Sequence, residues 1–404
     1  MPKERIRMVH RPMDSQDGAA HSNVTDEAAG TATVVVGGDL CPTGRNAEAF
    51  RNGDAVAIFG DLLESFRSAD LAIANLECPL ITEPSPIEQP GPVLGEDVVC
   101  IRGIREAGIG LVGLANNHIM DHGIRGLRTT LQTCAAAGLD TVGAGEDIAA
   151  ARTVRVKRVR GIRIGVLAMA EREFSIAGRS HGGANPLDPI DFVRNVRESR
   201  HAWDYLIVLL HGGNEDYPYP RPSLMEACRF LAEEGAGAVV CQHSHCPGCF
   251  ETHQDAHIVY GQGNLIFDWG PGRSNAWHEG FLVVLRVGRG TVKMEIIPYR
   301  QSDSRPGARR MEGRQEHAFR AALKTRSESI TDPTFVERQW DRFCLGQRSR
   351  YLALLCTNNS LSRALAGRFP VLQRLYSKRS LRLKLNLIRC ESHRDVLTRV
   401  LSKE

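Results

Sequence analysis

The sequence predicts a layered α/β domain followed by a basic helical C-terminal region. Short runs of Val, Ile, Leu and Ala recur through the first 300 residues and alternate with helix-like stretches such as 124–137 and 224–234. Such runs suit strands that are buried on both faces, and strands alternating with helices are typical of a layered α/β domain. Residues 281–287 and 292–297 predict a closing hairpin. After Pro306 the strand pattern gives way to helices.

The distribution of charge predicts the domain organisation. The chain carries a net charge of +4, yet residues 301–404 hold 22 Lys and Arg against 10 Asp and Glu, whereas the first 300 residues hold 29 against 37. We therefore expect a flexible polar tail over 1–30, the α/β domain over 31–300 and a basic helical region over 301–404.

Several classes of protein are disfavoured. No apolar run approaches the roughly 20 residues of a membrane-spanning helix, and residues 1–30 contain no apolar signal-peptide stretch. Most of the eleven cysteines lie in apolar segments, which suits free thiols in a reducing compartment. Walker, dinucleotide-binding, nucleophile-elbow and nucleic-acid-binding motifs are absent. The sequence thus predicts a cytoplasmic protein that binds no nucleic acid.

Polar residues able to bind a metal follow the apolar runs. These residues are Asp39, Glu77, Asn117 with His118, His211, His243 with His245, and Asn264. In open α/β sheets, sites form beyond the carboxyl ends of the strands. Carboxylates, imidazoles and amide oxygens together favour Zn, Mn or Fe. We therefore predict a divalent metal centre of one or two ions.

The strongest single element is His243-Ser244-His245. In an extended segment, residues two apart point to the same side, so both imidazoles could hold one ion or lie between two. The alternative interpretation is a surface loop that happens to be rich in histidine. His211, which also follows an apolar run, favours the metal interpretation.

The segment Ala115-Asn116-Asn117-His118, followed by Asp121, predicts catalytic side chains. An Asn oxygen can bind a metal and the adjacent His can act as a general acid, although Asn also favours turns and helix starts. Glu215 is either a partner that orients an imidazole or a solvated charge.

The pair Cys246 and Cys249 could mark a structural zinc site or a redox pair. We interpret these cysteines as bystanders, because no second pair and no thioredoxin-like context accompanies them.

The motifs together resemble the CapA family of capsule or poly-γ-glutamate synthesis proteins, which are related to calcineurin-like metallophosphoesterases. The motifs are Gly38-Asp39, Asn75-Leu76-Glu77, Asn116-Asn117-His118 with Asp121 and Gly123, His211-Gly-Gly-x-Glu215, His243-x-His245, and Tyr260-Gly-x-Gly-Asn264 with Asp268. This resemblance covers about residues 31–300. It implies a four-layer sandwich of two mixed sheets flanked by helices, with a metal centre at one edge.

The resemblance also implies roles for individual residues. The metal-ligand places fall on Asp39, Glu77, Asn117, His211, His243 and His245. His118 matches the catalytic acid, and Arg45 resembles an arginine that would hold an anionic substrate. Related phosphoesterases have Asp-x-His where this chain has Asp39-Leu40-Cys41, a departure that makes a one-metal site plausible.

Two functions are consistent with these features. The first is a metal-dependent hydrolase of phosphoester or γ-glutamyl amide bonds in a capsule-type polymer. The second is a non-catalytic component that binds metal and polymer in a capsule assembly or export complex. The expected partners are an anionic polymer or phosphorylated substrate, other capsule-synthesis proteins, and a membrane surface contacted peripherally by the basic C-terminal region.

Overall fold

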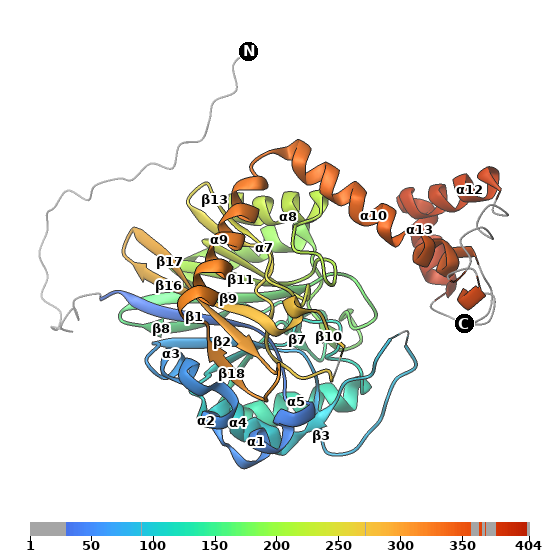
Figure 1. Ribbon diagram of the computed structural model, residues 1–404. Coiled ribbons are helices and arrows are strands. Elements are labelled where there is room, and N and C mark those ends of the chain that lie inside the picture. Colours follow the sequence, from blue (N-terminus) through green and yellow to red (C-terminus); the bar gives the residue numbers. More distant parts are fainter. Residues whose placement is uncertain are drawn as a thin grey trace, which may run out of the picture.

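The computed structural model describes residues 30–89, 91–270, 272–356, 363–365, 368 and 377–401. The tail predicted over residues 1–30 lies outside this part of the chain, apart from Gly30. Two large sheets of eight and six strands form the centre of the molecule (Figure 1).

The first sheet has the order β18-β17-β16-β1-β2-β5-β6, with β15 also pairing with β1. Its strands are β1 (Ala32–Cys41), β2 (Leu71–Leu76), β5 (Leu111–Gly113), β6 (Asp140–Val142), β15 (Asn264–Phe267), β16 (Glu279–Gly288), β17 (Thr291–Gln301) and β18 (Ala308–Arg310). β1, β2, β5, β6 and β15 run parallel, whereas β16, β17 and β18 extend the sheet by antiparallel pairing. The sheet is therefore mixed.

The second sheet has the order β13-β14-β12-β11-β9-β8. Its strands are β8 (Arg155–Val159), β9 (Ile162–Ala170), β11 (Tyr205–His211), β12 (Ala238–Gln242), β13 (Phe250–His253) and β14 (Ala256–Val259). The four central strands are parallel, and the two edge strands are antiparallel to their neighbours. This sheet is also mixed.

Alternate residues of β11 show how the layers pack. Ile207 and Leu209 belong to the core between the two sheets. Leu206, Val208 and Leu210 belong to a second core beneath helices. Successive residues of a strand point to opposite faces, so both faces of this sheet are covered.

Helices flank both sheets. They are α1 (Ala47–Asn52), α2 (Ala55–Phe59), α3 (Leu63–Arg67), α4 (Ile101–Glu106) and α5 (Gly123–Ala136) beside the first sheet, and α7 (Pro189–Ser199) and α8 (Pro222–Glu233) beside the second. Smaller elements are α6 (Ile148–Ala151) and the paired strands β3 (Leu80–Ile81) with β4 (Glu96–Asp97) and β7 (Ala144–Gly145) with β10 (Gly183–Ala184). The predicted α/β fold of two mixed sheets flanked by helices is confirmed.

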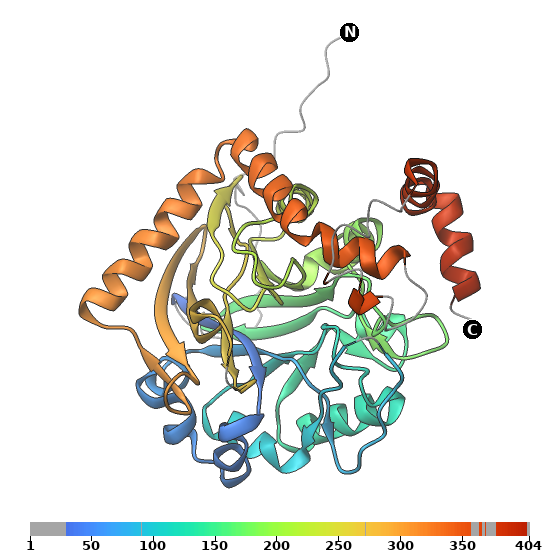
Figure 2. The same cartoon turned by 45° about the vertical axis from the view of Figure 1, so that its right-hand side comes forward.

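The C-terminal region contains α9 (Gly313–Ser329), α10 (Pro333–Cys356), α12 (Lys378–Arg389) and α13 (Glu391–Leu401). The expectation that strands end before Pro306 was wrong, because β18 follows it and pairs with β17. Phe319 of α9 joins the core of the first sheet, and Val336 of α10 joins that of the second. In contrast, α12 and α13 stand apart from both sheets (Figures 1 and 2). Within the described ranges, no helix combines the length and the apolar character needed to span a bilayer.

Candidate metal centre

The carboxyl ends of strands from both sheets meet at one edge of the molecule. In the first sheet, Asp39 at the end of β1 is in register with Asn75 of β2 and Asn264 of β15. In the second sheet, β11 ends at His211 and β12 ends just before His243. A Cβ on Gly38 would come within 2.0 Å of the Gly263 carbonyl oxygen, so this close crossing of strands requires glycine.

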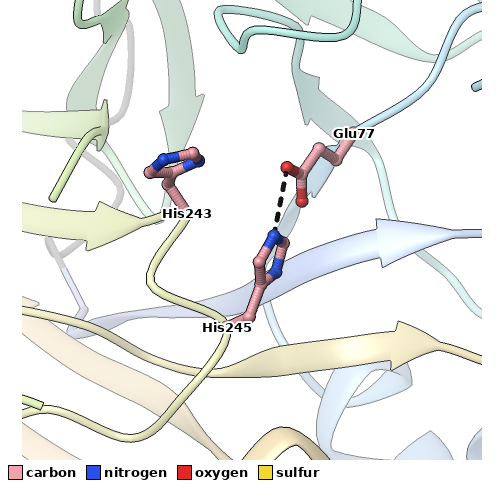
Figure 3. A group of neighbouring side chains, drawn as sticks. All are labelled: Glu77, His243 and His245. Carbon is pink, nitrogen blue, oxygen red and sulfur yellow. Dashed lines mark ion pairs between the residues drawn. The ribbon is translucent and has the colours of Figure 1, made fainter. Parts of the chain in front are cut away.

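A group of buried side chains at this edge can hold a cation. One ligand atom from each of Glu77, His243 and His245 lies within 4.8 Å of the other two. Figure 3 shows that His243 and His245 share the loop after β12, whereas Glu77 follows β2 and faces the His245 ring at 3.8 Å from Nε2. Two neutral imidazoles and a carboxylate suit a divalent transition metal.

Glu77 shows why a cation fits this position. Both carboxylate oxygens are buried, and neither has a hydrogen-bond partner within the described part of the chain. Burial raises the pKa of Glu77 to about 8. A buried carboxylate without partners is unfavourable unless a cation compensates its charge.

The histidines around Glu77 are in the form that binds metals. Burial, reinforced by the neighbouring imidazoles, lowers the pKa of His243 and His245 well below the usual value. Both rings are therefore neutral near pH 7, which leaves nitrogen lone pairs available to a cation.

The two histidines converge for a different reason from the predicted one. The segment is not extended, because His243 has φ of 94° and His245 has φ of 51°, both in a region that side-chain-bearing residues rarely adopt. The carboxylate of Asp39 accepts a hydrogen bond of 2.9 Å from the His243 backbone N–H. Asn264 Oδ1 lies 2.8 Å from His245 Nδ1. These contacts hold a strained backbone that aims both rings at Glu77.

Asp39, Asn117 and His211 complete the cluster. His211 Nε2 lies 2.9 Å from Asn117 Oδ1, 3.1 Å from His243 Nδ1 and 3.3 Å from Glu77 Oε1. Asn75 donates to Asp39 Oδ1 at 2.7 Å and lies 3.2 Å from His211 Nδ1. Burial followed by the charge of Glu77 raises the pKa of Asp39. All six residues predicted as metal ligands therefore lie in one connected cluster.

His118 lies next to this cluster and is oriented by Asp121. Its Nδ1 is 2.7 Å from Asp121 Oδ2. Burial alone would lower the pKa of His118, but the hydrogen bond to Asp121 and the charge of Glu77 outweigh it, so the pKa is raised. This arrangement favours an imidazolium that can donate a proton.

The guanidinium group of Arg45 forms hydrogen bonds with other residues of the protein. Its Nε and Nη2 contact the Asp268 carboxylate at 2.7 and 3.0 Å. Nη2 also donates to the backbone carbonyls of Ser302 and Asp303. These bonds tie the loop after β1 to the loops after β15 and β17, and they occupy much of the guanidinium.

The acidic residues after β9 were not predicted as part of the site, and Asn264 lies at the start of a strand, not after one as predicted. Glu173 hydrogen-bonds the Asn117 side chain, and burial, with the nearby acids, raises the pKa of Glu173. It follows the apolar run 162–170, so the rule applied to the other runs would have found it. Asn264 begins β15 instead of following β14, because the chain crosses to the first sheet between them. Cys246 and Cys249 are buried free thiols.

Comparison with known proteins identifies the family. Residues 33–269 match the family model described as bacterial capsule synthesis protein PGA_cap. Capsule biosynthesis protein CapA of Bacillus anthracis is 24% identical over 259 residues, covering 62% of each chain. PGA biosynthesis protein CapA of Bacillus subtilis is 27% identical over 250 residues, covering 60% of this chain and 65% of its own. A probable polyglutamine synthesis accessory protein of Mycobacterium tuberculosis is 29% identical over 214 residues, covering 48% of this chain and 56% of its own.

The match to these relatives is partial, since it spans less than two thirds of the length of each. The match to the family model, however, takes in more than half of the 404 residues and contains the cluster from Asp39 to His245. The chain belongs to the bacterial capsule synthesis protein PGA_cap family.

Proposed function

We propose that this protein is a metal-dependent hydrolase that acts on an anionic polymer of the capsule or poly-γ-glutamate type. The observation that carries the proposal is Glu77, whose two buried oxygens have no hydrogen-bond partner among the described residues and lie near the neutral imidazoles of His243 and His245. Of the cations that this donor set favours, Zn, Mn and Fe are the candidates.

Glu77, His243 and His245 would hold the ion, while Asp39, Asn117 and His211 would bind or orient around it. A divalent cation bound there would polarise the scissile group and lower the pKa of a coordinated water. His118, held by Asp121, would protonate the leaving group, which typically contributes 10²- to 10⁴-fold in rate. The polymer class is taken from the names of the relatives and from the family description.

Two substitutions separate metal binding from proton transfer. We expect His243→Ala to lose both bound metal and turnover, because it removes a ligand. We expect His118→Ala to retain metal but lose at least about a hundredfold in turnover, because it removes the acid. Elemental analysis and hydrolysis of γ-glutamyl peptides and phosphoesters measure the two properties. His253→Ala, at an exposed ion pair with Glu233, is the matched control.

The outcomes distinguish the two functions considered. If both variants hydrolyse substrate at the wild-type rate, the assigned site is wrong. If the wild-type protein binds metal through His243 but hydrolyses neither class of substrate, the non-catalytic alternative, a metal- and polymer-binding component of a capsule assembly complex, replaces the hydrolase.

A further inference from the structure

Exposed large apolar side chains are concentrated in the C-terminal part of the described chain, whereas most apolar side chains elsewhere are buried. Sixteen large hydrophobic residues are exposed within the described ranges, and twelve of them lie at or beyond Leu345. On α12, Leu383, Leu385 and Ile388 are 62%, 44% and 49% exposed. A concentration of exposed apolar residues in one region indicates an interaction surface.

The same region is exclusively cationic over a long stretch. Residues 345–390 contain ten Lys and Arg and no Asp or Glu. Elsewhere in the chain, acids outnumber bases over the first 300 residues. A partner for this region must therefore offer negative charge together with an apolar phase.

The two kinds of side chain are segregated around α12. Arg379, Arg382 and Arg389 recur at steps of three and seven residues, with Asn386 between them, and so share one side of the helix. Leu385 and Ile388 lie on one flank of this cationic side and Leu383 on the other, while Leu381, Lys384 and Leu387 on the remaining side are half-buried. Exposed apolar residues beside a cationic helix side are the arrangement that lies in the plane of a membrane interface.

Among the described residues, α12 contacts the end of α10 and packs against α13. Lys384, the one cation amid the apolar residues of α12, donates to the carbonyl oxygen of Leu355 at the end of α10 at 2.8 Å. This bond, and packing of α12 against α13, orient the helix without covering Leu383, Leu385 or Ile388. Figures 1 and 2 both show α12 and α13 beyond the edge of the two sheets.

We propose that α12 docks the protein on an anionic phospholipid surface, with Leu385 and Ile388 inserted among the acyl chains and Arg379, Arg382 and Arg389 against the headgroups. A soluble anionic polymer would satisfy the arginines but would leave the apolar residues in water. A second copy of the chain would cover the apolar residues but would bring the five cations of its α12 against the five of the first. An anionic lipid surface satisfies both requirements. This inference does not depend on the proposed hydrolase activity.

Co-sedimentation of the full chain with phospholipid vesicles tests the proposal. We expect binding to phosphatidylglycerol-containing vesicles, little binding to phosphatidylcholine vesicles, and weaker binding at high salt. The double variant Leu385→Ser, Ile388→Ser should bind anionic vesicles about a hundredfold more weakly, since two inserted side chains are lost. Ile190→Ser is the matched control, because Ile190 is similarly exposed but lies on α7.

Other occupants of the surface give different results. If the apolar residues pack against another part of this chain, the double variant lowers the melting temperature and leaves vesicle binding unchanged. If a second copy covers them, the variant changes the molecular mass in sedimentation. If poly-γ-glutamate binds but anionic vesicles do not, the ligand is a polymer. Each of these results overturns the lipid proposal.

Discussion

The metal centre and the C-terminal helix α12 depart from ordinary protein packing in opposite directions. At the centre, the carboxyl group of Glu77 is buried without a hydrogen-bond partner among the described residues. On α12, apolar groups such as Leu385 are exposed. A stable chain seldom retains either feature unless something else completes it. The chemistry of each site indicates what would complete it. A small cation would complete the metal centre, and an anionic surface with an apolar interior would complete α12.

The largest expected effect concerns Glu77→Gln in the metal-free protein. Glu77 has an ordinary pKa of 4.5 that burial raises to about 8, so the wild-type protein loses stability as pH rises between these values. At pH 7 the neutral amide should therefore increase the free energy of unfolding of the metal-free protein by roughly 3 kcal/mol, at about 1.4 kcal/mol per pH unit. Thermal or urea unfolding across pH 4 to 8 measures the difference.

Added metal should make the wild-type protein more stable than the Glu77→Gln variant. At about a thousandfold excess over its dissociation constant, a cation stabilises the wild-type protein by roughly 4.1 kcal/mol, which exceeds the roughly 3 kcal/mol advantage of the metal-free variant, and the variant should gain little. Glu106→Gln on α4, an exposed position, is the matched control and should change neither property. Equal stability of wild type and variant at pH 7 without metal would show that burial of the Glu77 carboxyl group does not destabilise the protein. The contrast between the metal centre and α12 would then be lost.

The sequence predicted the layers and the site because both depend on local patterns. Apolar runs marked β1, β2, β5, β11 and β12, and the polar residues after them are brought together by the shared direction of parallel strands.

Other features depend on contacts between distant segments. The positive φ values of His243 and His245 rely on Asp39 and Asn264, which are far away in the chain. The partners of Arg45 come from loops more than 200 residues later. No local pattern encodes such contacts, so the sequence could name these residues but not their geometry.

A second prediction tests how Asp121 positions His118. Asp121 also accepts from the Leu94 backbone N–H at 2.6 Å through Oδ2 and from Gln89 Nε2 at 3.0 Å through Oδ1. Asp121→Asn can therefore keep an acceptor for Leu94 and His118 while losing the negative charge and the bond from Gln89. We expect metal content to stay unchanged and turnover to fall about a hundredfold.

The pH profile distinguishes positioning from general damage to the site. A general acid must be protonated, so activity falls as pH rises through the pKa of His118. Without the Asp121 charge that pKa is lower, and the alkaline loss of activity should move to lower pH. Asp147→Asn, at the helix cap of α6, is the control and should leave the profile in place. An unmoved profile in Asp121→Asn would limit Asp121 to holding the loop.

The smallest expected effect concerns the charges of α12. Each cation near an anionic surface contributes about 1 kcal/mol, so Arg379→Gln with Arg382→Gln should weaken binding to anionic vesicles by up to about thirtyfold, less than the loss of Leu385 and Ile388. Arg102→Gln with Arg105→Gln on α4 repeats the same spacing at exposed positions and should have little effect. High salt should remove the difference between wild type and the α12 variant, because it screens the charges but not the apolar insertion. A charge variant that weakens binding as much as the apolar variant, or more, would mean that attraction alone holds α12 at the surface. The exposure of the leucines on α12 would then need another explanation, and α12 would no longer contrast with the metal centre as a surface completed by an apolar partner.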